Sequence, residues 1–167
     1  ALQAGFAAEP DAARRGAAEE AINSGRELAR WGQRGEPAPA PLPAQAQQTA
    51  PVRQALLAFV GLDACRLAAS GAAPIDPEVI EFFQALGLPM VEGWGMTELT
   101  NAATISHPDQ ARNGAVGTAC PGVEVQLAGD GEVLVRGPLV MRGYYRDLAR
   151  TADTLDRDGW LHTGDIG

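Results

Sequence analysis

The sequence predicts an α/β fold in which a partial parallel sheet is followed by a small antiparallel, barrel-like β-subdomain, together forming an incomplete domain. Between residues 65 and 92, two short apolar segments flank an amphipathic one, and each apolar segment ends in a Gly-rich turn, as in a parallel sheet. Between residues 123 and 136, apolar and polar residues alternate on both sides of Gly129-Asp130-Gly131, which predicts a β-hairpin. Ligands of parallel sheets gather at the carboxyl ends of strands, so both Gly-rich turns are expected on one side.

The composition is that of an acidic globular protein with restricted chemistry. Of the 167 residues, 46% are hydrophobic and 20% are charged, which suits one globular domain or a piece of a larger one. The net charge of −8, without a clustered basic stripe, disfavours nucleic acid and anionic membrane surfaces as main partners. All 13 basic residues are Arg, so this chain supplies no P-loop, Schiff-base or catalytic Lys.

Cysteine usage and hydropathy favour a reducing, cytoplasmic setting. Cys65 and Cys120 lie far apart and show neither a zinc-ligand spacing nor a disulfide framework. No run of about 18 apolar residues and no charged-then-apolar leader is present, so neither a transmembrane span nor a signal peptide is predicted. No Met precedes Met90, and residues 163–167 stop inside a Gly-rich motif. We therefore expect the chain to be part of a longer polypeptide.

The first 51 residues divide into a helical segment and a linker. Residues 9–31 are rich in Ala, Glu and Arg, and Asp11 is the expected N-cap of a surface helix. Gly16 and the Asn23-Ser24-Gly25 stretch interrupt the pattern, so two shorter helices are equally compatible. Residues 35–51 hold five prolines, many Ala and Gln and few large apolar residues, which predicts an extended or disordered linker.

The remaining sequence has the periodicity of alternating helices and strands. An apolar helical face at residues 52–60 ends at Gly61, and residues 65–70 read as a short buried strand. A turn at 70–74 leads to Asp76-Pro77, an N-cap followed by Pro at the first helical position. The helix has an apolar face. Its members are Val79, Ile80, Phe83 and Leu86, with Gly87 closing the helix and residues 88–92 forming a second strand. The predicted divisions are thus 1–34 (helical segment), 35–51 (Ala/Pro-rich linker), 52–110 (α/β portion) and 111–167 (β-subdomain portion).

The stretch Gly93 to Thr100, with the sequence GWGMTELT, is the strongest candidate for a binding turn. Two glycines flank an aromatic ring, and a hydroxyl and a carboxylate follow, which suits backbone approach to a flat, phosphorylated ligand. Two structural interpretations remain beside the functional one. Trp94 can be a half-buried packing residue, and Thr97 can cap a helix that begins at Glu98.

Four stretches together resemble the adenylate-forming (AMP-binding) superfamily, and most closely its long-chain fatty acyl-CoA synthetases (ligases). They are SGAAP at 70–74, GWGMTE at 93–98, GEVLVRGPLVMRGYY at 131–145 and DGWLHTGDIG at 158–167. The resemblance runs from about residue 52 to the end and corresponds to the central to late part of the family's N-terminal domain. It implies an enzyme that joins a fatty acid to coenzyme A in two steps, with ATP and Mg²⁺, through an acyl-adenylate.

The resemblance also implies roles for single residues. Gly71, Ala72 and Ala73 would lie beside the adenine, and Trp94, where the family usually has Tyr, would offer a stacking face to the base. Asp165 would accept hydrogen bonds from the ribose hydroxyls.

The phosphate end of the implied site falls in the same stretch. Thr97 would contact the α-phosphate, and Glu98 would hold Mg²⁺, so these two are the catalytic candidates. Gly93 and Gly95 would border the acyl channel, and Met96 would line the nucleotide site with them. Other polar and aromatic side chains are given no part in the chemistry. His107 and His162 are interpreted as not catalytic, Tyr144 and Tyr145 as structural aromatics of the small subdomain, and Arg136 and Arg142 as surface or hairpin charges.

The resemblance leaves alternatives open at the level of function. One is a non-catalytic nucleotide-binding relic or interaction module, because the chain has no Lys. The other is an acyl-AMP ligase that passes the acyl group to a carrier protein. The expected partners are the small molecules fatty acid, ATP and coenzyme A, without nucleic acid or a transmembrane span, and peripheral membrane contact stays open.

Overall fold

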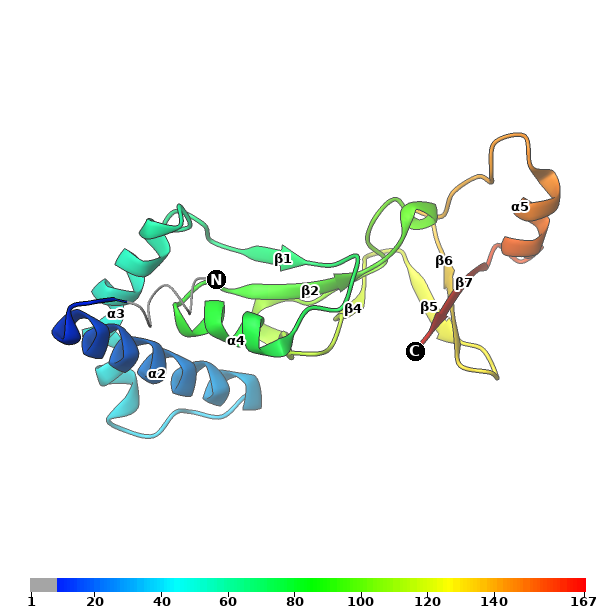
Figure 1. The fold of residues 1–167 in the computed structure, drawn as a ribbon. Coiled ribbons are helices and arrows are strands. Elements are labelled where there is room, and N and C mark those ends of the chain that lie inside the picture. The colour runs from blue at the N-terminus through cyan, green and yellow to red at the C-terminus, as the bar shows by residue number, and fades with distance from the viewer. Residues whose placement is uncertain (1–8) are drawn as a thin grey trace. The chain divides into compact units, whose positions relative to one another are not determined.

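A computed structural model describes residues 9–167, and the first eight residues of the predicted 1–34 segment lie outside that range. The chain forms two compact units, which Figure 1 shows as ribbons. The first unit comprises residues up to 70 together with 75–91 and 108–114, and the second comprises 71–74, 92–107 and 115–167. Helices and strands are mixed in the order expected for an α/β protein, so the predicted fold class is confirmed.

The first unit begins with one uninterrupted helix, α2 (Ala12–Arg34). The Asp11 side chain accepts hydrogen bonds from the backbone N–H groups of Ala13 and Arg14, which confirms the predicted N-cap. The helix ends at Gly35, whose φ of 67° is the left-handed conformation that glycine adopts readily. The alternative of two shorter helices is wrong, because the backbone continues through both predicted interruptions.

The second helix, α3 (Leu42–Phe59), overturns the prediction of an extended or disordered linker for residues 42–51. It packs against α2 and buries Leu42, Ala46 and Leu57. Pro43 lies in its first turn, where a missing N–H costs nothing, although Pro51 lies inside the helix. Composition misled the prediction because Ala and Gln are good helix formers, and α2 supplies the apolar surface that the segment itself lacks.

A strand–helix–strand unit follows, formed by β1 (Ala68–Ser70), α4 (Pro77–Ala85) and β2 (Met90–Trp94). The Asp76 side chain accepts from the Glu78 N–H and so caps α4 as predicted. Figure 1 draws β1 and β2 running in the same direction, and the Ala68 N–H donates to the Pro89 carbonyl. Both predicted strands exist, but their details differ from the prediction. The first is confined to Ala68–Ser70, and none of its residues is buried, so its prediction as a buried strand over 65–70 is wrong in that respect. The second begins two residues later than predicted and includes Gly93 and Trp94.

The core of the first unit lies between these elements and α3. Its buried members are Leu57, Phe82, Leu86 and Leu88. The predicted apolar face of α4 is partly wrong, because Val79 is 41% exposed whereas Phe82 is buried. Six of the ten residues from Val79 to Leu88 are bulky and apolar, so the periodicity of this short helix fits several rotations about its axis equally well.

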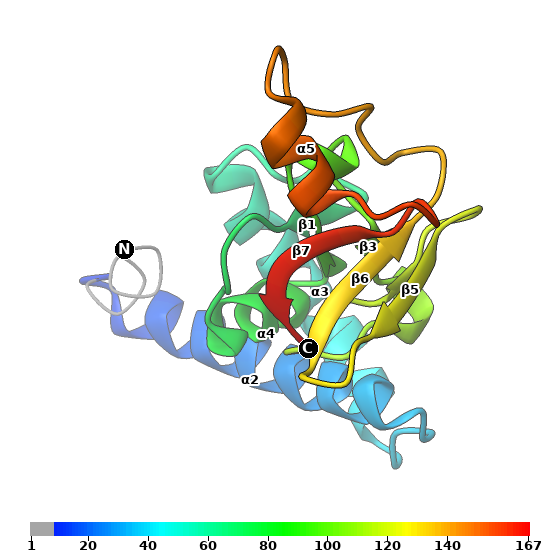
Figure 2. The ribbon, with the colours of Figure 1, turned by 90° about the vertical axis from the view of Figure 1, so that its right-hand side faces the viewer.

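The second unit is mainly antiparallel. The last residues of β2 pair antiparallel with β3 (Thr104–Ile105), which pairs antiparallel with β4 (Thr118–Ala119). The strand order of this sheet is β1-β2-β3-β4. Because it contains antiparallel pairs, the sheet is mixed and not purely parallel. A separate sheet has the order β5-β6-β7, with β5 (Glu124–Leu127) and β6 (Glu132–Arg136) forming the predicted hairpin. Figure 2 shows β7 (Leu161–Ile166) beside β6.

The connecting segments of the second unit carry its remaining elements. A 3₁₀ turn, η1 (Thr97–Leu99), follows β2, and α5 (Leu148–Thr154) precedes β7. Another 3₁₀ turn, η2 (Pro108–Gln110), lies in the segment 108–114, which belongs to the first unit. The buried cluster consists of Leu99, Ala103, Val135 and Leu161. Over the described residues 9–167, no helix has both the length and the apolar character needed to cross a membrane.

Gly25 provides a test of the packing between α2 and α4. A Cβ atom at this position would overlap with the Ala85 carbonyl oxygen, whereas a Cβ at Gly16 of the same helix would meet nothing. We expect Gly25→Ala to lower the free energy of unfolding by about 2 kcal/mol, since overpacking forces the helices apart.

The matched variant Gly16→Ala should raise the same free energy by up to about 1 kcal/mol, because Ala favours the helix and nothing opposes it. Urea denaturation of both variants measures the two effects. Equal stability of the two variants would contradict the close approach of α2 and α4.

Candidate functional site

The segment from Gly95 to Asn101 forms a tight turn that folds back on itself. The Met96 carbonyl accepts hydrogen bonds from the N–H groups of Leu99 and Asn101, and the Leu99 side chain is fully buried. Thr100 and Asn101 have φ values of 54° and 98°, which reverse the chain. A Cβ at Gly95 would overlap with the Asn101 carbonyl oxygen, so the turn requires glycine there.

A second turn lies against this segment within the same unit. It begins at Gly71, where a Cβ would be 2.8 Å from the Gly93 carbonyl oxygen, so glycine allows the two backbones to approach. Ala72, the next residue, has a φ of 68°, a left-handed conformation that is unusual for a residue with a side chain. The prediction that both Gly-rich turns lie on one side is therefore confirmed.

The two turns border a pocket of about 590 Å³. It is lined by Ala72, Gly95, Met96, Thr97, Glu98, Thr100 and Asn101. Five of these were predicted from the sequence, but Gly71, Ala73 and Gly93 are not among the lining residues. Thr100 and Asn101 were missed; Asn tolerates the left-handed conformation, which is the one signal that marked the end of the turn.

Thr97 does not cap a helix, so that structural interpretation is wrong. Met96 occupies the N-cap position of η1 without a side-chain cap, and Thr97 is the first residue of the turn. The Thr97 side chain is exposed at the pocket. Its hydroxyl is therefore available to a ligand.

Trp94 and Asp165 come together from β2 and β7. The indole Nε1–H of Trp94 donates to Oδ2 of Asp165 at 2.7 Å, a charge-assisted bond. Trp94 is half-buried and packs against the cluster around Leu99, so the packing interpretation describes part of its surface. The hydrogen bond uses one oxygen of the exposed Asp165 carboxylate and leaves Oδ1 for another donor.

Glu98 is held from two sides by the segment that precedes α5. The Tyr144 hydroxyl donates to Oε1 of Glu98 at 2.8 Å, and the Met141 N–H donates to the Glu98 carbonyl at 2.7 Å. The sequence interpretation of Tyr144 as a structural aromatic missed this contact, because nothing in the local pattern pairs residues 46 positions apart.

The donor set at Glu98 fits Mg²⁺ bound together with a phosphorylated ligand. In residues 9–167 no three His, Cys, Asp or Glu side chains gather as a metal cage. Mg²⁺ commonly takes one or two carboxylates and completes its shell with phosphate oxygens and water, so a single carboxylate at the pocket suits it. Glu98 Oε2 makes no hydrogen bond within that part of the chain.

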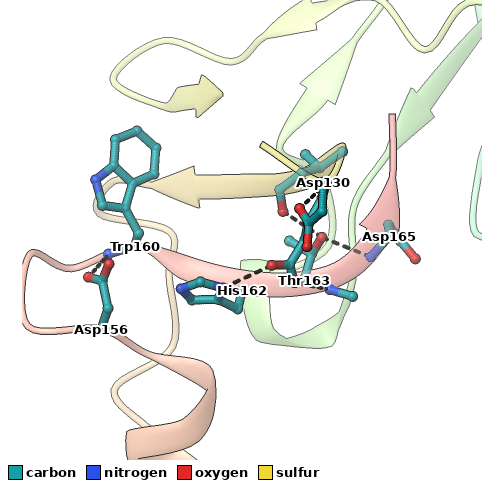
Figure 3. A network of polar contacts seen from close by, with 9 residues as sticks. Asp130, Asp156, Trp160, His162, Thr163 and Asp165 are labelled. Atoms are coloured by element: carbon teal, nitrogen blue, oxygen red, sulfur yellow. Dashed lines mark hydrogen bonds and ion pairs between the residues drawn. The ribbon is translucent and has the colours of Figure 1, made fainter. Parts of the chain in front are cut away.

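A polar network fixes the strand that carries Asp165, and Figure 3 shows it along β7. His162 Nδ1 lies 2.9 Å from Glu132 Oε2, and the Gly164 N–H donates to Glu132 Oε1 at 2.9 Å. The Thr163 hydroxyl donates to the Val133 carbonyl and accepts from the Asp165 N–H. The hydrogen bond from His162, helped by the one from Gly164, lowers the pKa of the Glu132 carboxyl. His162 thus joins β7 to β6 through Glu132.

Comparison with known proteins assigns this arrangement to a family. The family model described as "AMP-binding enzyme" matches residues 18–145. The chain belongs to the AMP-binding enzyme family. Its matched region contains both turns, the pocket and Glu98, although Asp165 lies beyond the match.

Relatives and solved structures that resemble the chain agree with that assignment. The chain is 53% identical over 107 residues to a putative fatty-acid–CoA ligase, fadD11, of Mycobacterium tuberculosis, covering 64% of the chain and 19% of that protein. It is 44% identical over 114 residues to long-chain-fatty-acid–CoA ligase 1 of Cavia porcellus, covering 61% and 16%. The crystal structure of the N-terminal domain of FACL13 from M. tuberculosis superposes with a TM-score of 0.59 at 26% identity, covering 71% of this chain and 34% of that one. The matched region thus spans less than a fifth of the length of each of the two ligases.

The Glu132 network predicts a pH dependence of stability. The pKa of Glu132 is lower in the folded protein than in the unfolded chain, so the carboxylate stabilises the fold fully above its unfolded pKa, and this contribution is lost as pH falls through the folded value. The stability advantage of the wild type over Glu132→Gln should therefore shrink between about pH 5 and pH 3.

Urea midpoints measured across that range for both proteins test the prediction. Comparing the two proteins at each pH isolates the contribution of residue 132 and its immediate contacts. A difference that stays constant from pH 6 to pH 3 would count against the network.

Proposed function

We propose that the protein containing this chain is an ATP-dependent fatty acid–CoA ligase that acts on long-chain acids. The observation that carries the proposal is the pocket in which Thr97 and Glu98 lie across from the Ala72 turn. The two relatives with the names given above support the fatty-acid substrate and the coenzyme A acceptor. Such a ligase is an ATP-using enzyme that forms a carbon–sulfur bond.

The proposed reaction has two steps. The fatty acid carboxylate attacks the α-phosphorus of ATP and displaces pyrophosphate, and the coenzyme A thiol then attacks the acyl-adenylate and displaces AMP. Thr97 donates its hydroxyl to an α-phosphate oxygen, which steadies the negative charge that develops there. Glu98 would hold Mg²⁺, and the ion would supply charge neutralisation at the phosphates.

The nucleoside end is recognised by backbone and by one carboxylate. The turn containing Gly71, Ala72 and Ala73 lies beside the adenine, where small side chains allow close backbone contact. The Trp94 ring offers a face to the base, and the Asp165 Oδ1 accepts from a ribose hydroxyl. Gly93 and Gly95, which have no side chains, border the acyl channel, and Met96 lines the nucleotide site.

Three further statements belong to the proposal. The protein works in the cytoplasm, its substrates are small molecules rather than nucleic acids, and any membrane contact is peripheral. Two alternatives are distinguished by experiment. One is a ligase with a carrier protein as acceptor, and the other is a non-catalytic nucleotide-binding module.

Glu98 is the first residue to test. Glu98→Ala in the full-length protein should lower ATP–pyrophosphate exchange with palmitate by about 100-fold, because the metal loses the carboxylate that Glu98 supplies at the pocket. The control Glu20→Ala, which removes an exposed carboxylate from α2, should leave the rate unchanged.

The outcome also separates the alternatives. One outcome is that the wild type catalyses exchange but transfers the acyl group to a carrier protein and not to coenzyme A. In that case the proposed acceptor, coenzyme A, would be wrong, and the protein would be an acyl-AMP ligase that uses a carrier protein. Binding of ATP and Mg²⁺ without any exchange would instead support the non-catalytic module and overturn the proposed ligase.

Asp165 is the second residue to test, through the ribose. Asp165→Ala should weaken ATP binding about tenfold, since a charge-assisted hydrogen bond is lost, and it should abolish the preference for ATP over 2′,3′-dideoxy-ATP. Calorimetric titration of both nucleotides measures the two effects.

Asp158, the other exposed aspartate of the DGWLHTGDIG stretch, supplies the control. Asp158→Ala should bind both nucleotides as the wild type does. A wild type that does not distinguish ATP from the dideoxy compound would refute the role given to Asp165.

A further inference from the structure

The Tyr144 hydroxyl donates a hydrogen bond to the carboxylate of Glu98. The hydrogen bond to Oε1 is 2.8 Å long and part-buried, and it joins the turn after β2 to the segment before α5. The rest of that segment is fastened to the same turn, since the Thr100 hydroxyl donates to the Leu139 carbonyl at 2.8 Å.

The Tyr144 side chain is itself held in place by α5. The Arg150 guanidinium lies 4.3 Å from the centroid of the Tyr144 ring, and the Tyr144 N–H donates to the Thr151 hydroxyl at 2.9 Å. Gly143 permits this approach, because a Cβ there would lie 2.7 Å from Thr151 Cγ2. Backbone, ring and hydroxyl of Tyr144 are thus each fixed by a different partner.

From this arrangement we infer that Tyr144 is a positioning residue that orients the Glu98 carboxylate for the metal. A free glutamate side chain samples several rotamers, and the hydrogen bond to Oε1 restricts them while Oε2 stays available. Partners that orient a metal ligand in this way raise metal affinity by tenfold or more. The inference rests on the proposed function, since it assumes that Glu98 holds Mg²⁺.

The neighbouring tyrosine supplies a matched control. Tyr145 follows Tyr144 directly, but its side chain is 85% exposed, and its ring contact is with Arg146 instead of the turn. Tyr144→Phe removes one hydroxyl while keeping the ring under Arg150, and Tyr145→Phe removes one hydroxyl from the adjacent position. Circular dichroism of both variants checks that the fold is kept.

The experiment measures metal binding directly. Mn²⁺, as a paramagnetic substitute for Mg²⁺, is titrated by electron paramagnetic resonance into the full-length protein saturated with α,β-methylene-ATP. We expect Tyr144→Phe to weaken Mn²⁺ binding about tenfold and Tyr145→Phe to leave it unchanged. Binding of the nucleotide without metal should be the same in all three proteins, a result that general loss of structure would not give.

A double-mutant comparison separates positioning from other effects. In the Glu98→Ala background, Tyr144→Phe should have no further effect on Mn²⁺ affinity, because the carboxylate that it orients is gone. The inference would be overturned if Tyr144→Phe bound Mn²⁺ as tightly as the wild type does. It would also be overturned if Tyr144→Phe lowered the Mn²⁺ affinity as much in the Glu98→Ala background as in the wild-type background. Either result would leave the proposed function intact. Absence of nucleotide-dependent Mn²⁺ binding by the wild type would overturn both.

Discussion

The second unit depends on the tight backbone turn between Gly95 and Asn101. The turn can close because residue 95 is a glycine, since a Cβ atom there would overlap with the Asn101 carbonyl oxygen. Two residues at its end have left-handed backbone, and the fully buried Leu99 side chain anchors it. Left-handed backbone at Thr100 is unfavourable for a β-branched residue, so the surrounding contacts must hold it. The hydrogen bond from Thr100 to Leu139 is one such contact.

This constraint sorts the side chains of the turn by role. Leu99 points into the apolar cluster, which fixes the turn, while Thr97 and Glu98 remain at the pocket. Because the two polar residues are neighbours in a 3₁₀ turn, one anchor sets the direction of both. A turn anchored by one buried side chain thus presents a hydroxyl and a carboxylate with little backbone freedom, which is what pre-organised binding of a charged ligand requires.

Charged contacts in the same unit serve the framework around this turn. Arg136 forms a two-point ion pair with Glu124 across β5 and β6, and its guanidinium lies 4.5 Å from the centroid of the Trp160 ring. Glu132 joins β6 to β7 through His162 and Gly164. These pairs hold the sheet whose last strand carries Asp165, so charge stabilises the position of that residue without taking part in the pocket itself.

The sequence by itself determined the elements whose signals are local. The N-caps Asp11 and Asp76, the hairpin around Gly129-Asp130-Gly131 and the two Gly-rich turns follow from residue types at fixed spacing, and the structure has them all. Tertiary structure alone decided what depends on distant partners. Residues 42–51 became helical because α2 covers them, the buried face of α4 was selected by the core, and Tyr144 met Glu98 across 46 positions. Local propensity sets which backbone conformations are cheap, but only packing chooses among side chains that the chain brings together from far apart.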